Sequence, residues 1–473
     1  MKIRAVFFVV SMLCSLAANA TLPQPVADAL KKAGVPEHNV AVYVQAVADK
    51  NPILEHNPNQ AMNTASVMKV VTTHAALDML TPAYRWKTEV YRDGTLANWV
   101  LQGDLVIKGY GDPSFKAQDF WRLLMGLRQA GIKKINGDLR IDKSQFASNL
   151  ANLNFDAEKW RAYNASPSAF LVNGRNTSFK FSSVDDAVSV LQEFELPEVV
   201  IVNKMQPAKG ACGDWRSRMT YEVKAVQNQV REEAQVQVTF SGTYPATCGE
   251  RFLELSVLND DQYAFYTFKK LWRELGGEFN GVLKVSEKSS TAVKVLEQWS
   301  EPLGSVVRDI NKWSNNVMAK QLLLTLAAEK VSLPASEAGG SEAIKRWLAG
   351  KGLQFDELVI ENGSGLSRIE QISAAHLGQL LVSAYNSPIM PEMMASLPIL
   401  SLDGTVQQRL KESASNGRAH LKTGSINGVS AIAGYVLDAN GHRHVLVMMV
   451  NHPKAGASRA AQDALIEWVH QQP

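Results

Sequence analysis

The chain has 473 residues, of which 46% are hydrophobic and 20% charged, a globular composition that excludes wholesale disorder. Its formal net charge is +3, with 49 basic against 46 acidic residues, so the charge does not favour a nucleic-acid partner. A chain of this length has room for about three domains. Beyond the N-terminus no apolar run reaches the roughly 18 residues needed to span a bilayer, so no transmembrane anchor is expected after the leader is removed.

Residues 1–20 have the pattern of a secretory signal peptide. Lys2 and Arg4 precede the apolar residues 5–16, and Ala18-Asn19-Ala20 supplies a small-x-small cleavage site. A first core helix or a membrane anchor is the alternative, but the apolar stretch is short for a span. We therefore expect export followed by cleavage.

Cleavage would remove Cys14 and leave Cys212 and Cys248. Two cysteines in an exported protein favour one disulfide, which would stabilise the fold by about 4 kcal/mol on the chain-entropy model. Two free buried thiols are the alternative. If the disulfide forms, a cysteine nucleophile and a cysteine-based zinc site are excluded.

The first predicted elements of the mature chain are a strand and a buried helix. Residues 40–47 (VAVYVQAV) alternate apolar side chains as a strand does. Residues 64–80 are expected to form a helix that is apolar on nearly every face, and such a helix normally lies in the middle of a domain. Within it, Ser66-Val67-Met68-Lys69 places a hydroxyl and an amine three residues apart, on one side of the helix.

This S-x-x-K pair has the chemistry of a nucleophile and its base. Burial among apolar neighbours lowers the pKa of a lysine, so a neutral Lys69 amine can take the proton of Ser66. The positive end of the helix dipole also favours negative charge developing on Ser66. S-x-x-K alone is a weak motif, so an alternative stays open, in which the charged end of Lys69 reaches solvent.

Residues 95–285 have a different character, with short strand patterns and turn signals, and both remaining cysteines lie among them. From about residue 295 helices return, including 304–330. There, Ser314-Asn315-Asn316 stands at the start of a strong helical pattern, where Ser314 could relay a proton and Asn316 could hold a substrate amide. A helix N-cap is the alternative, and a second S-x-N occurs at Ser425-Ile426-Asn427.

A third motif, Lys422-Thr423-Gly424, begins a β-run. Lys422 and Thr423 can bind a terminal carboxylate through charge and a hydroxyl. Gly424 is expected to leave room for a substrate backbone beside an edge strand. A surface lysine at the entry of a strand is the alternative.

The chain is expected to end in a hairpin and a helix. Residues 429–437 and 444–450 form two strands around Asn440-Gly441, the strongest short hairpin signal. Residues 457–469 form a final amphipathic helix whose apolar face is ordinary core packing.

The order of the three motifs is more specific than any one of them. S-x-x-K on a buried helix, then S-x-N at a helix start, then K-T-G on a strand is the signature of penicillin-recognising serine enzymes. About 250 residues separate Ser66 from Ser314, far more than in a compact β-lactamase. Nearly 200 residues of β-rich chain must therefore be inserted between the first two motifs.

On these residues the chain resembles the penicillin-binding protein 4 family, the low-molecular-mass class C D-Ala-D-Ala carboxypeptidases/endopeptidases, over essentially the whole mature chain. Further matching segments are Gly103-Asp104-Leu105, Gly111-Asp112-Pro113, Ala165-Ser166-Pro167-Ser168-Ala169, Gly213-Asp214, Gly363-Ser364-Gly365-Leu366-Ser367-Arg368 and Asp403-Gly404-Thr405. The resemblance implies an α/β fold in which a β-lactamase/transpeptidase-like domain, an antiparallel sheet flanked by helices, is interrupted by a β-rich insertion. We expect the catalytic domain at 21–90 and 290–473, and the insertion at 91–289 as two smaller domains, the inner one at about 175–260.

The resemblance also implies the roles of individual residues. Ser66 would be the acylated nucleophile and Lys69 its base, with the backbone N–H groups of Ser66 and Ser425 as the oxyanion hole. Ser314, Asn316 and Lys422 would complete the catalytic set. The substrate-binding residues would be Thr423, Gly424, Ser425, Arg368 and Asn427, and Arg368 would line the pocket for the third residue of the substrate.

Two departures from the family concern that pocket. Asn362 stands where the family often has Asp before G-S-G, and Asn427 stands where a relative has Gln. Both put the specificity of the pocket in question and leave the acyl-transfer machinery intact. The expected partners are peptidoglycan peptides and β-lactam antibiotics, the expected location is the periplasm, and no cofactor or metal is expected.

Three other functions share part of this pattern. A serine β-lactamase would hydrolyse its acyl-enzyme quickly, but no clear equivalent of a deacylating Glu follows the S-x-N motif. A non-catalytic penicillin sensor or wall-binding module would not need the full set of reactive side chains. A zinc D,D-peptidase needs clustered ligands, and the only close histidine pair is His442-Arg443-His444, in a predicted strand.

Overall fold

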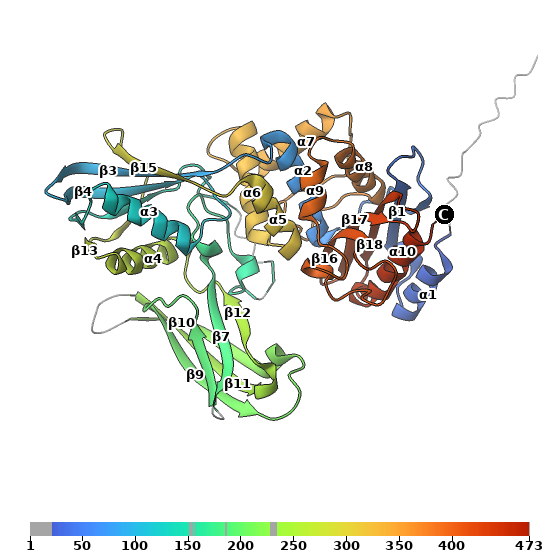
Figure 1. Ribbon diagram of the computed structural model, residues 1–473, viewed down its shortest axis with the longest axis horizontal. Helices are drawn as coiled ribbons and strands as arrows, with labels where there is room; N and C mark the ends of the chain where they lie inside the picture. Colours follow the sequence, from blue (N-terminus) through green and yellow to red (C-terminus); the bar gives the residue numbers. More distant parts are fainter. Residues whose placement is uncertain (1–20, 151–154, 157, 185–186, 228–233, 473) are drawn as a thin grey trace, which may run out of the picture.

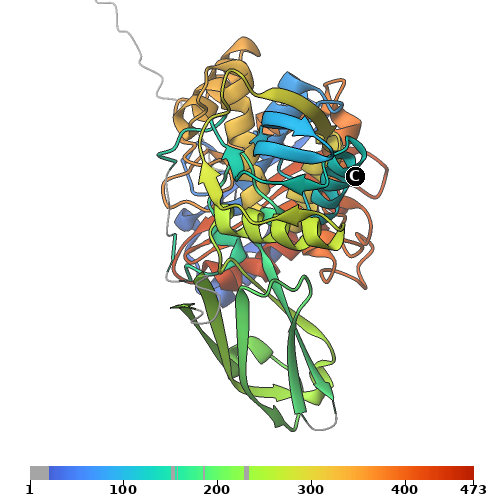
Figure 2. The same ribbon diagram turned by 90° about the vertical axis from the view of Figure 1, so that its left-hand side faces the viewer.

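The computed structural model describes residues 21–472 except 151–154, 157, 185–186 and 228–233, so the predicted signal peptide at 1–20 lies outside the described residues. Figure 1 shows three parts: a mixed helix-and-sheet region, a sheet with two helices beside it, and a β-rich lobe that projects from the second part. Figure 2 shows the same lobe pointing away from the rest of the chain. Within the described part, every helix falls short of the length and apolar character that crossing a bilayer requires.

A five-stranded antiparallel sheet forms the centre of the first part, in the order β16-β17-β18-β1-β2. Its strands are β1 (Val40–Ala46), β2 (Leu54–His56), β16 (Ala419–Ile426), β17 (Val429–Leu437) and β18 (Arg443–Asn451). Every residue of β1 is buried because its side chains alternate between two cores. Val42 faces the core under α1 (Gln24–Ala33) and α10 (Arg459–His470), whereas Tyr43 faces the helices of the opposite side.

Six helices cover that opposite side: α2 (Met68–Leu80), α5 (Leu303–Trp313), α6 (Asn316–Lys330), α7 (Glu337–Gly350), α8 (Ala374–Tyr385) and α9 (Met390–Ser396). Helix α2 is buried at every residue from Met68 to Leu77, as its uniformly apolar sequence predicts. The helix expected at 304–330 is instead two helices, because Ser314 takes a left-handed conformation (φ 58°) and Asn315 caps α6.

The second part begins and ends at one place in the fold. The backbone N–H of Ser300 donates to the Trp86 carbonyl (2.9 Å), so the chain leaves and returns side by side. Between these residues lies a seven-stranded sheet of β3 (Lys87–Ala97), β4 (Val100–Gly109), β5 (Lys134–Ile135), β6 (Leu139–Asp142), β13 (Glu278–Phe279), β14 (Leu283–Val285) and β15 (Val293–Trp299). Helices α3 (Ala117–Gln129) and α4 (Asp260–Glu274) pack against it.

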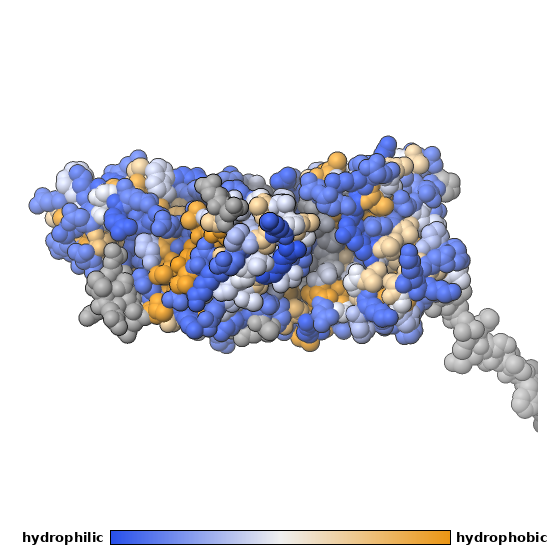
Figure 3. Space-filling view, turned by 90° about the horizontal axis from the view of Figure 1, so that it is seen from below, coloured by the Kyte–Doolittle hydropathy of each residue, from blue (hydrophilic) through white to orange (hydrophobic). Residues whose placement is uncertain are grey.

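The projecting lobe consists of two three-stranded sheets with an aromatic core. Its strands are β7 (Thr177–Val184), β8 (Ala187–Gln192), β9 (Val199–Ala208), β10 (Met219–Gln227), β11 (Ala234–Pro245) and β12 (Arg251–Leu255). Phe179, Phe181 and Phe240 meet edge to face between the sheets. The predicted disulfide between Cys212 and Cys248 is confirmed, with Cα atoms 4.7 Å apart. The face in Figure 3 is largely hydrophilic, with hydrophobic side chains in separate patches.

The predicted fold class, an antiparallel sheet flanked by helices and interrupted by β-rich chain, is confirmed. For the domain limits we propose a catalytic unit of residues 21–90 and 290–473 and an insertion of 91–289, with an inner part at about 175–260. The pairing of β3 with β15 supports an insertion at this place in the chain, although it places the neck near 86 and 300, so that β3 and β15 both belong to the sheet of the insertion.

Candidate active site

The three sequence motifs meet at one place, although they come from distant parts of the chain. Ser66 lies in a 3-10 turn, η2 (Ala65–Val67), immediately before α2, and Lys69 lies in the first turn of α2. Lys69 Nζ is 3.0 Å from Ser66 Oγ and 2.6 Å from Asn316 Oδ1, at the start of α6. Lys422 Nζ, from edge strand β16, donates to Ser314 Oγ at 2.9 Å.

The hydrogen bonds of Lys69 suit a base. Its side chain is fully buried, and burial, followed by the charge of Lys422, holds the pKa of the Lys69 amine well below its usual value. The amine contacts Asn316 Oδ1 and the Ser364 carbonyl, two groups that can only accept, and Ser66 Oγ. A neutral amine has two N–H bonds and one lone pair. Because the two acceptors take the N–H bonds, the lone pair is left for the Ser66 hydroxyl.

Ser314 and Asn316 point into the site because the expected helix is interrupted at Ser314 and Asn315. Asn315 takes the capping role, and its side chain accepts from the Met318 N–H at 3.1 Å. The capping interpretation therefore holds for Asn315 and not for Ser314. This division frees the Ser314 hydroxyl to accept from Lys422 and the Asn316 amide to accept from Lys69.

Lys422 is fully buried, so it does not lie at the surface as the alternative reading of K-T-G required. Its ammonium group contacts Ser314 Oγ and the Thr423 carbonyl (2.6 Å). Burial lowers the pKa of Lys422 from 10.5 to about 7. The Lys422 amine is thus joined to the Ser314 hydroxyl, and Thr423, which is half-buried, lies at the same edge.

Gly424 stands where two segments of the backbone approach each other closely. A Cβ at Gly424 would lie 2.3 Å from the Thr64 carbonyl oxygen and 2.9 Å from the Ser66 nitrogen. The missing side chain thus lets β16 pack directly against the turn that carries Ser66, and the room expected for a substrate backbone stays a prediction. This contact fixes the position of the Ser66 backbone relative to the K-T-G strand.

The remaining predicted binding residues lie around the far end of β16. Ser425, Arg368 and Asn427 are exposed, and Arg368 Nη1 donates to the Asn427 carbonyl at 2.9 Å. The Arg368 guanidinium also lies 4.3 Å from the ring of Phe155, which comes from the insertion. Thr423 Oγ1 lies 2.7 Å from Thr405 Oγ1, so the D-G-T segment also reaches the site.

Two contributors were not assigned a role from sequence. The Ser364 carbonyl holds Lys69, and the buried Glu370 carboxylate holds the loop that contains Ser364. The G-S-G triplet was a usable signal, because Gly363 and Gly365 take positive φ angles of 72° and 78° and so form a tight turn. Glu370 follows two exposed residues, and no local pattern marks it as buried.

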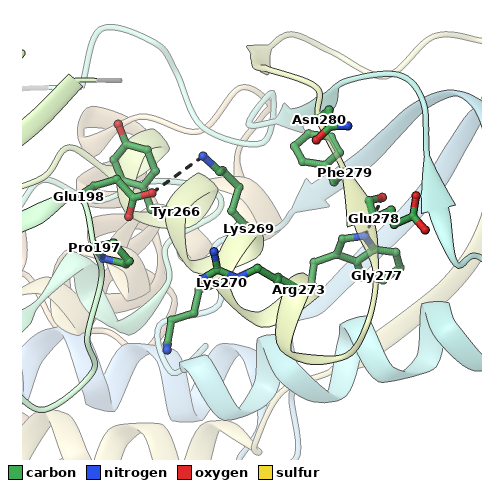
Figure 4. A pocket seen from close by; sticks show the side chains of 11 residues that line it. Pro197, Glu198, Tyr266, Lys269, Lys270, Arg273, Gly277, Glu278, Phe279 and Asn280 are labelled. Atoms are coloured by element: carbon green, nitrogen blue, oxygen red, sulfur yellow. Dashed lines mark hydrogen bonds and ion pairs between the residues drawn. The ribbon is translucent and has the colours of Figure 1, made fainter. Parts of the chain in front are cut away.

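A hollow in the insertion, away from these motifs, does not assemble comparable chemistry. Figure 4 shows one of about 400 Å³ between α4 and the segment near Pro197. Its cations are partly neutralised, since Lys269 lies 3.9 Å from Glu198 and Lys270 lies 2.7 Å from Glu274. Among the residues that the structure describes, no three His, Cys, Asp or Glu side chains are arranged to hold a metal ion.

The fold is shared with a penicillin-binding protein and with a peptidoglycan endopeptidase. The crystal structure of penicillin binding protein 4 from Haemophilus influenzae superposes with a TM-score of 0.75 and 24% identity, covering 93% of this chain and 99% of that chain. A predatory peptidoglycan endopeptidase from Bdellovibrio bacteriovorus superposes with a TM-score of 0.52 and 17% identity, over 91% and 92% of the two chains.

The sequence comparison then places the chain in a family. The model of the D-Ala-D-Ala carboxypeptidase 3 (S13) family matches residues 22–472, so the chain belongs to that family and is a D-Ala-D-Ala carboxypeptidase. A D-alanyl-D-alanine carboxypeptidase from Haemophilus influenzae is 26% identical over 88% of this chain and 86% of its own length. One from Actinomadura sp. is 26% identical over 90% and 80%. The resemblance inferred from the motifs is confirmed.

Proposed function

We propose that the protein removes the terminal D-alanine of peptidoglycan stem peptides through an acyl-enzyme on Ser66, and that it also cleaves D-Ala–diamino-acid cross-links. The observation that carries this proposal is the Lys69 amine, 3.0 Å from Ser66 Oγ, with its two other contacts occupied by acceptors. A base in this arrangement removes the serine proton as the hydroxyl attacks a carbonyl.

Acylation would begin with a stem peptide lying antiparallel to β16, with its terminal carboxylate near Thr423. Ser66 Oγ attacks the penultimate carbonyl carbon while Lys69 takes its proton, and the Ser66 and Ser425 N–H groups bind the oxyanion. As the C–N bond breaks, Ser314 gives its proton to the leaving amine and takes one from Lys422. The two hydrogen-bonded pairs of this proton transfer are Lys69 Nζ with Ser66 Oγ at 3.0 Å and Lys422 Nζ with Ser314 Oγ at 2.9 Å.

Deacylation would return both protons. A water molecule gives one proton back to Lys422 through Ser314 and attacks the ester carbonyl, while Lys69 returns its proton to Ser66 Oγ as the C–O bond breaks. The enzyme is then restored, and the same steps apply to a cross-link in which the leaving amine belongs to a diamino acid.

A β-lactam would acylate Ser66 in the same way but keep its leaving group tethered. A β-lactam complex of the Haemophilus influenzae protein and a penicillin G-acylated form of the Bdellovibrio bacteriovorus endopeptidase support this step. We also propose export to the periplasm, which the leader pattern at residues 1–20 and the disulfide between Cys212 and Cys248 support.

The proposal is tested by labelling the purified protein with fluorescent penicillin. The wild type and Ser217→Ala, which removes an exposed hydroxyl in the insertion, should label equally, and Ser66→Ala should not label. Equal labelling of Ser66→Ala would refute the nucleophile assignment. An acyl-enzyme that survives for minutes separates this enzyme from a β-lactamase.

Two substrates separate the two proposed activities. Release of D-alanine from a pentapeptide ending in D-Ala-D-Ala tests the carboxypeptidase, and mass spectrometry of digested sacculi tests the cleavage of cross-links. Loss of D-alanine without loss of cross-linked dimers would restrict the protein to carboxypeptidase activity.

A further inference from the structure

A buried carboxylate organises the loop of residues 361–365, which lies beside the proposed base. Glu370 is 1% exposed, and its two oxygens accept four backbone N–H bonds from this loop. The donors are Glu361 (3.0 Å), Asn362 (2.8 Å) and Gly363 (2.7 Å) to Oε1, and Gly365 (2.7 Å) to Oε2. Burial raises the pKa of the Glu370 carboxyl, but the backbone N–H bonds act in the opposite direction because they stabilise the ionised form, in which both oxygens accept.

The 361–365 loop touches both the base and the nucleophile. The Ser364 carbonyl accepts from Lys69 Nζ, and the Gly363 carbonyl accepts from Thr72 Oγ1, one helical turn further along α2, at 2.7 Å. At Gly365 a Cβ would lie only 1.8 Å from the Ala65 carbonyl oxygen, so the loop lies directly against the residue before Ser66. A change in this loop therefore reaches both reacting groups.

The direction of the Ser364 carbonyl decides which way the amine faces. If this acceptor moved away, the Lys69 amine could rotate and point an N–H bond, instead of its lone pair, at Ser66 Oγ. The Glu370 carboxylate bonds to the loop and not to Lys69 or Ser66, so it acts on these two residues through the loop and through its charge.

The charge matters because the neighbourhood is strongly cationic. Lys69 and Lys422 are fully buried and Lys320 is 7% exposed. The charges of Lys422 and Lys320 lower the pKa of Lys69, whereas the charge of Glu370 raises it. The groups that act on Lys320 from the surrounding elements are Glu370, Arg175, Glu337 and Glu361. Asn362, where the family often has Asp, is neutral and bonds to Ser364 and Leu366, so Glu370 provides the buried negative charge of this loop.

We propose that Glu370 is a positioning residue for acyl transfer: its carboxylate holds the 361–365 loop so that the Ser364 carbonyl orients the Lys69 amine, and its charge balances the buried lysines. The proposal rests on the proposed role of Lys69 as the base of Ser66. Glu370 acts in two ways, by holding the loop and by its charge, so a substitution that removes the charge and one that shortens the side chain should give different results.

The experiment measures the rate constant of acylation by fluorescent penicillin as a function of pH. Glu370→Gln keeps the size of the side chain but removes its charge, so the acidic limb of the profile should move about one unit to lower pH, because Lys69 loses its nearest opposing charge. Glu370→Asp keeps the charge but shortens the reach to the loop. The acidic limb of the Glu370→Asp profile should stay at the wild-type pH, while the plateau rate falls about tenfold.

Glu361→Gln is the matched control, because it makes the same chemical change on a half-buried side chain of the same loop. Its profile should coincide with that of the wild type, and thermal unfolding should show that all variants are folded. If Glu370→Gln does not fold, the plateau rate of Glu370→Asp alone decides the matter.

The proposal is overturned if folded Glu370→Gln retains the wild-type limb, if Glu361→Gln shifts it equally, or if Glu370→Asp retains the wild-type plateau. These failures are distinct from failure of the proposed function. In the latter case the wild type itself would not be acylated at Ser66.

Discussion

The site and the insertion bury charged groups in opposite ways. In the described part of the chain, Lys69 and Lys422 are fully buried without an ion pair to a carboxylate. In the insertion, Arg140 lies near the surface between Asp93 (3.0 Å) and Asp104 (2.6 Å), and the interior is filled by aromatic rings. Burying an unpaired cation opposes folding, whereas apolar burial favours it.

This difference is expected if Lys69 and Lys422 serve the proposed chemistry and the packed rings of the insertion serve stability. Amines that are partly or wholly neutral can exchange protons near neutral pH, which a solvated lysine cannot do. In the insertion, Arg140 shows the usual arrangement, with its charge paired beside a packed core. Substitutions in the two regions should therefore affect different measurements.

The largest expected effect is the loss of activity in Lys69→Met. Removal of a general base should lower the acylation rate by about 10³-fold or more. The free energy of unfolding should change by less than about 1.5 kcal/mol, because removing a buried amine offsets the loss of hydrogen bonds to Asn316 and Ser364. Penicillin labelling measures the acylation rate, and urea unfolding measures the free energy of unfolding. A strong destabilisation would contradict the expected difference between the site and the insertion.

The next effect lies in the insertion. Phe240 is fully buried between Phe179 and Phe181, so Phe240→Ala should lower the free energy of unfolding by about 3–5 kcal/mol through a cavity. The acylation rate of the folded protein should stay within about twofold of the wild type, since the ring lies far from the motifs in the fold. Urea unfolding and labelling of the same sample test this, and a large rate loss would show that the lobe acts on the site.

A smaller effect is the pH dependence that Lys422 adds to stability. Its pKa of about 7 in the folded protein is below its ordinary 10.5, so between these values the unfolded chain holds a proton that the folded chain lacks. The contribution of Lys422 to stability therefore rises with pH from about 7 to 10.5. Comparing melting temperatures at pH 7 and 9.5 in the wild type and Lys422→Met isolates it, and equal rises in both proteins would contradict the expectation.

The smallest expected effect concerns Lys320, whose charge lowers the pKa of Lys69. Lys320→Met should move the acidic limb of the acylation profile to higher pH by about half a unit, opposite in sign to Glu370→Gln. The profile of penicillin labelling between pH 5 and 9 measures the shift. A shift toward acid would contradict this role of the Lys320 charge and point instead to its contact with the Ala165 carbonyl (3.5 Å).

Much of the fold could be predicted from local patterns. Alternation predicted β1, the uniformly apolar run predicted α2, and Asn440-Gly441 predicted the hairpin of β17 and β18. Periodicity and turn chemistry are properties of neighbouring residues, so the chain alone carries them. The same holds for the order of the three motifs, which was sufficient to recognise the family that the comparison with known proteins confirms.

The tertiary structure alone decided how the site is assembled. It showed that Ser314 breaks the expected helix, that Gly424 admits the backbone of Ser66, and that Glu370 lies buried behind the base. The last two depend on the close approach of segments separated by hundreds of residues. Local sequence records which conformations a segment prefers, but the burial of a charge and the distance between two backbones arise only when the whole chain packs.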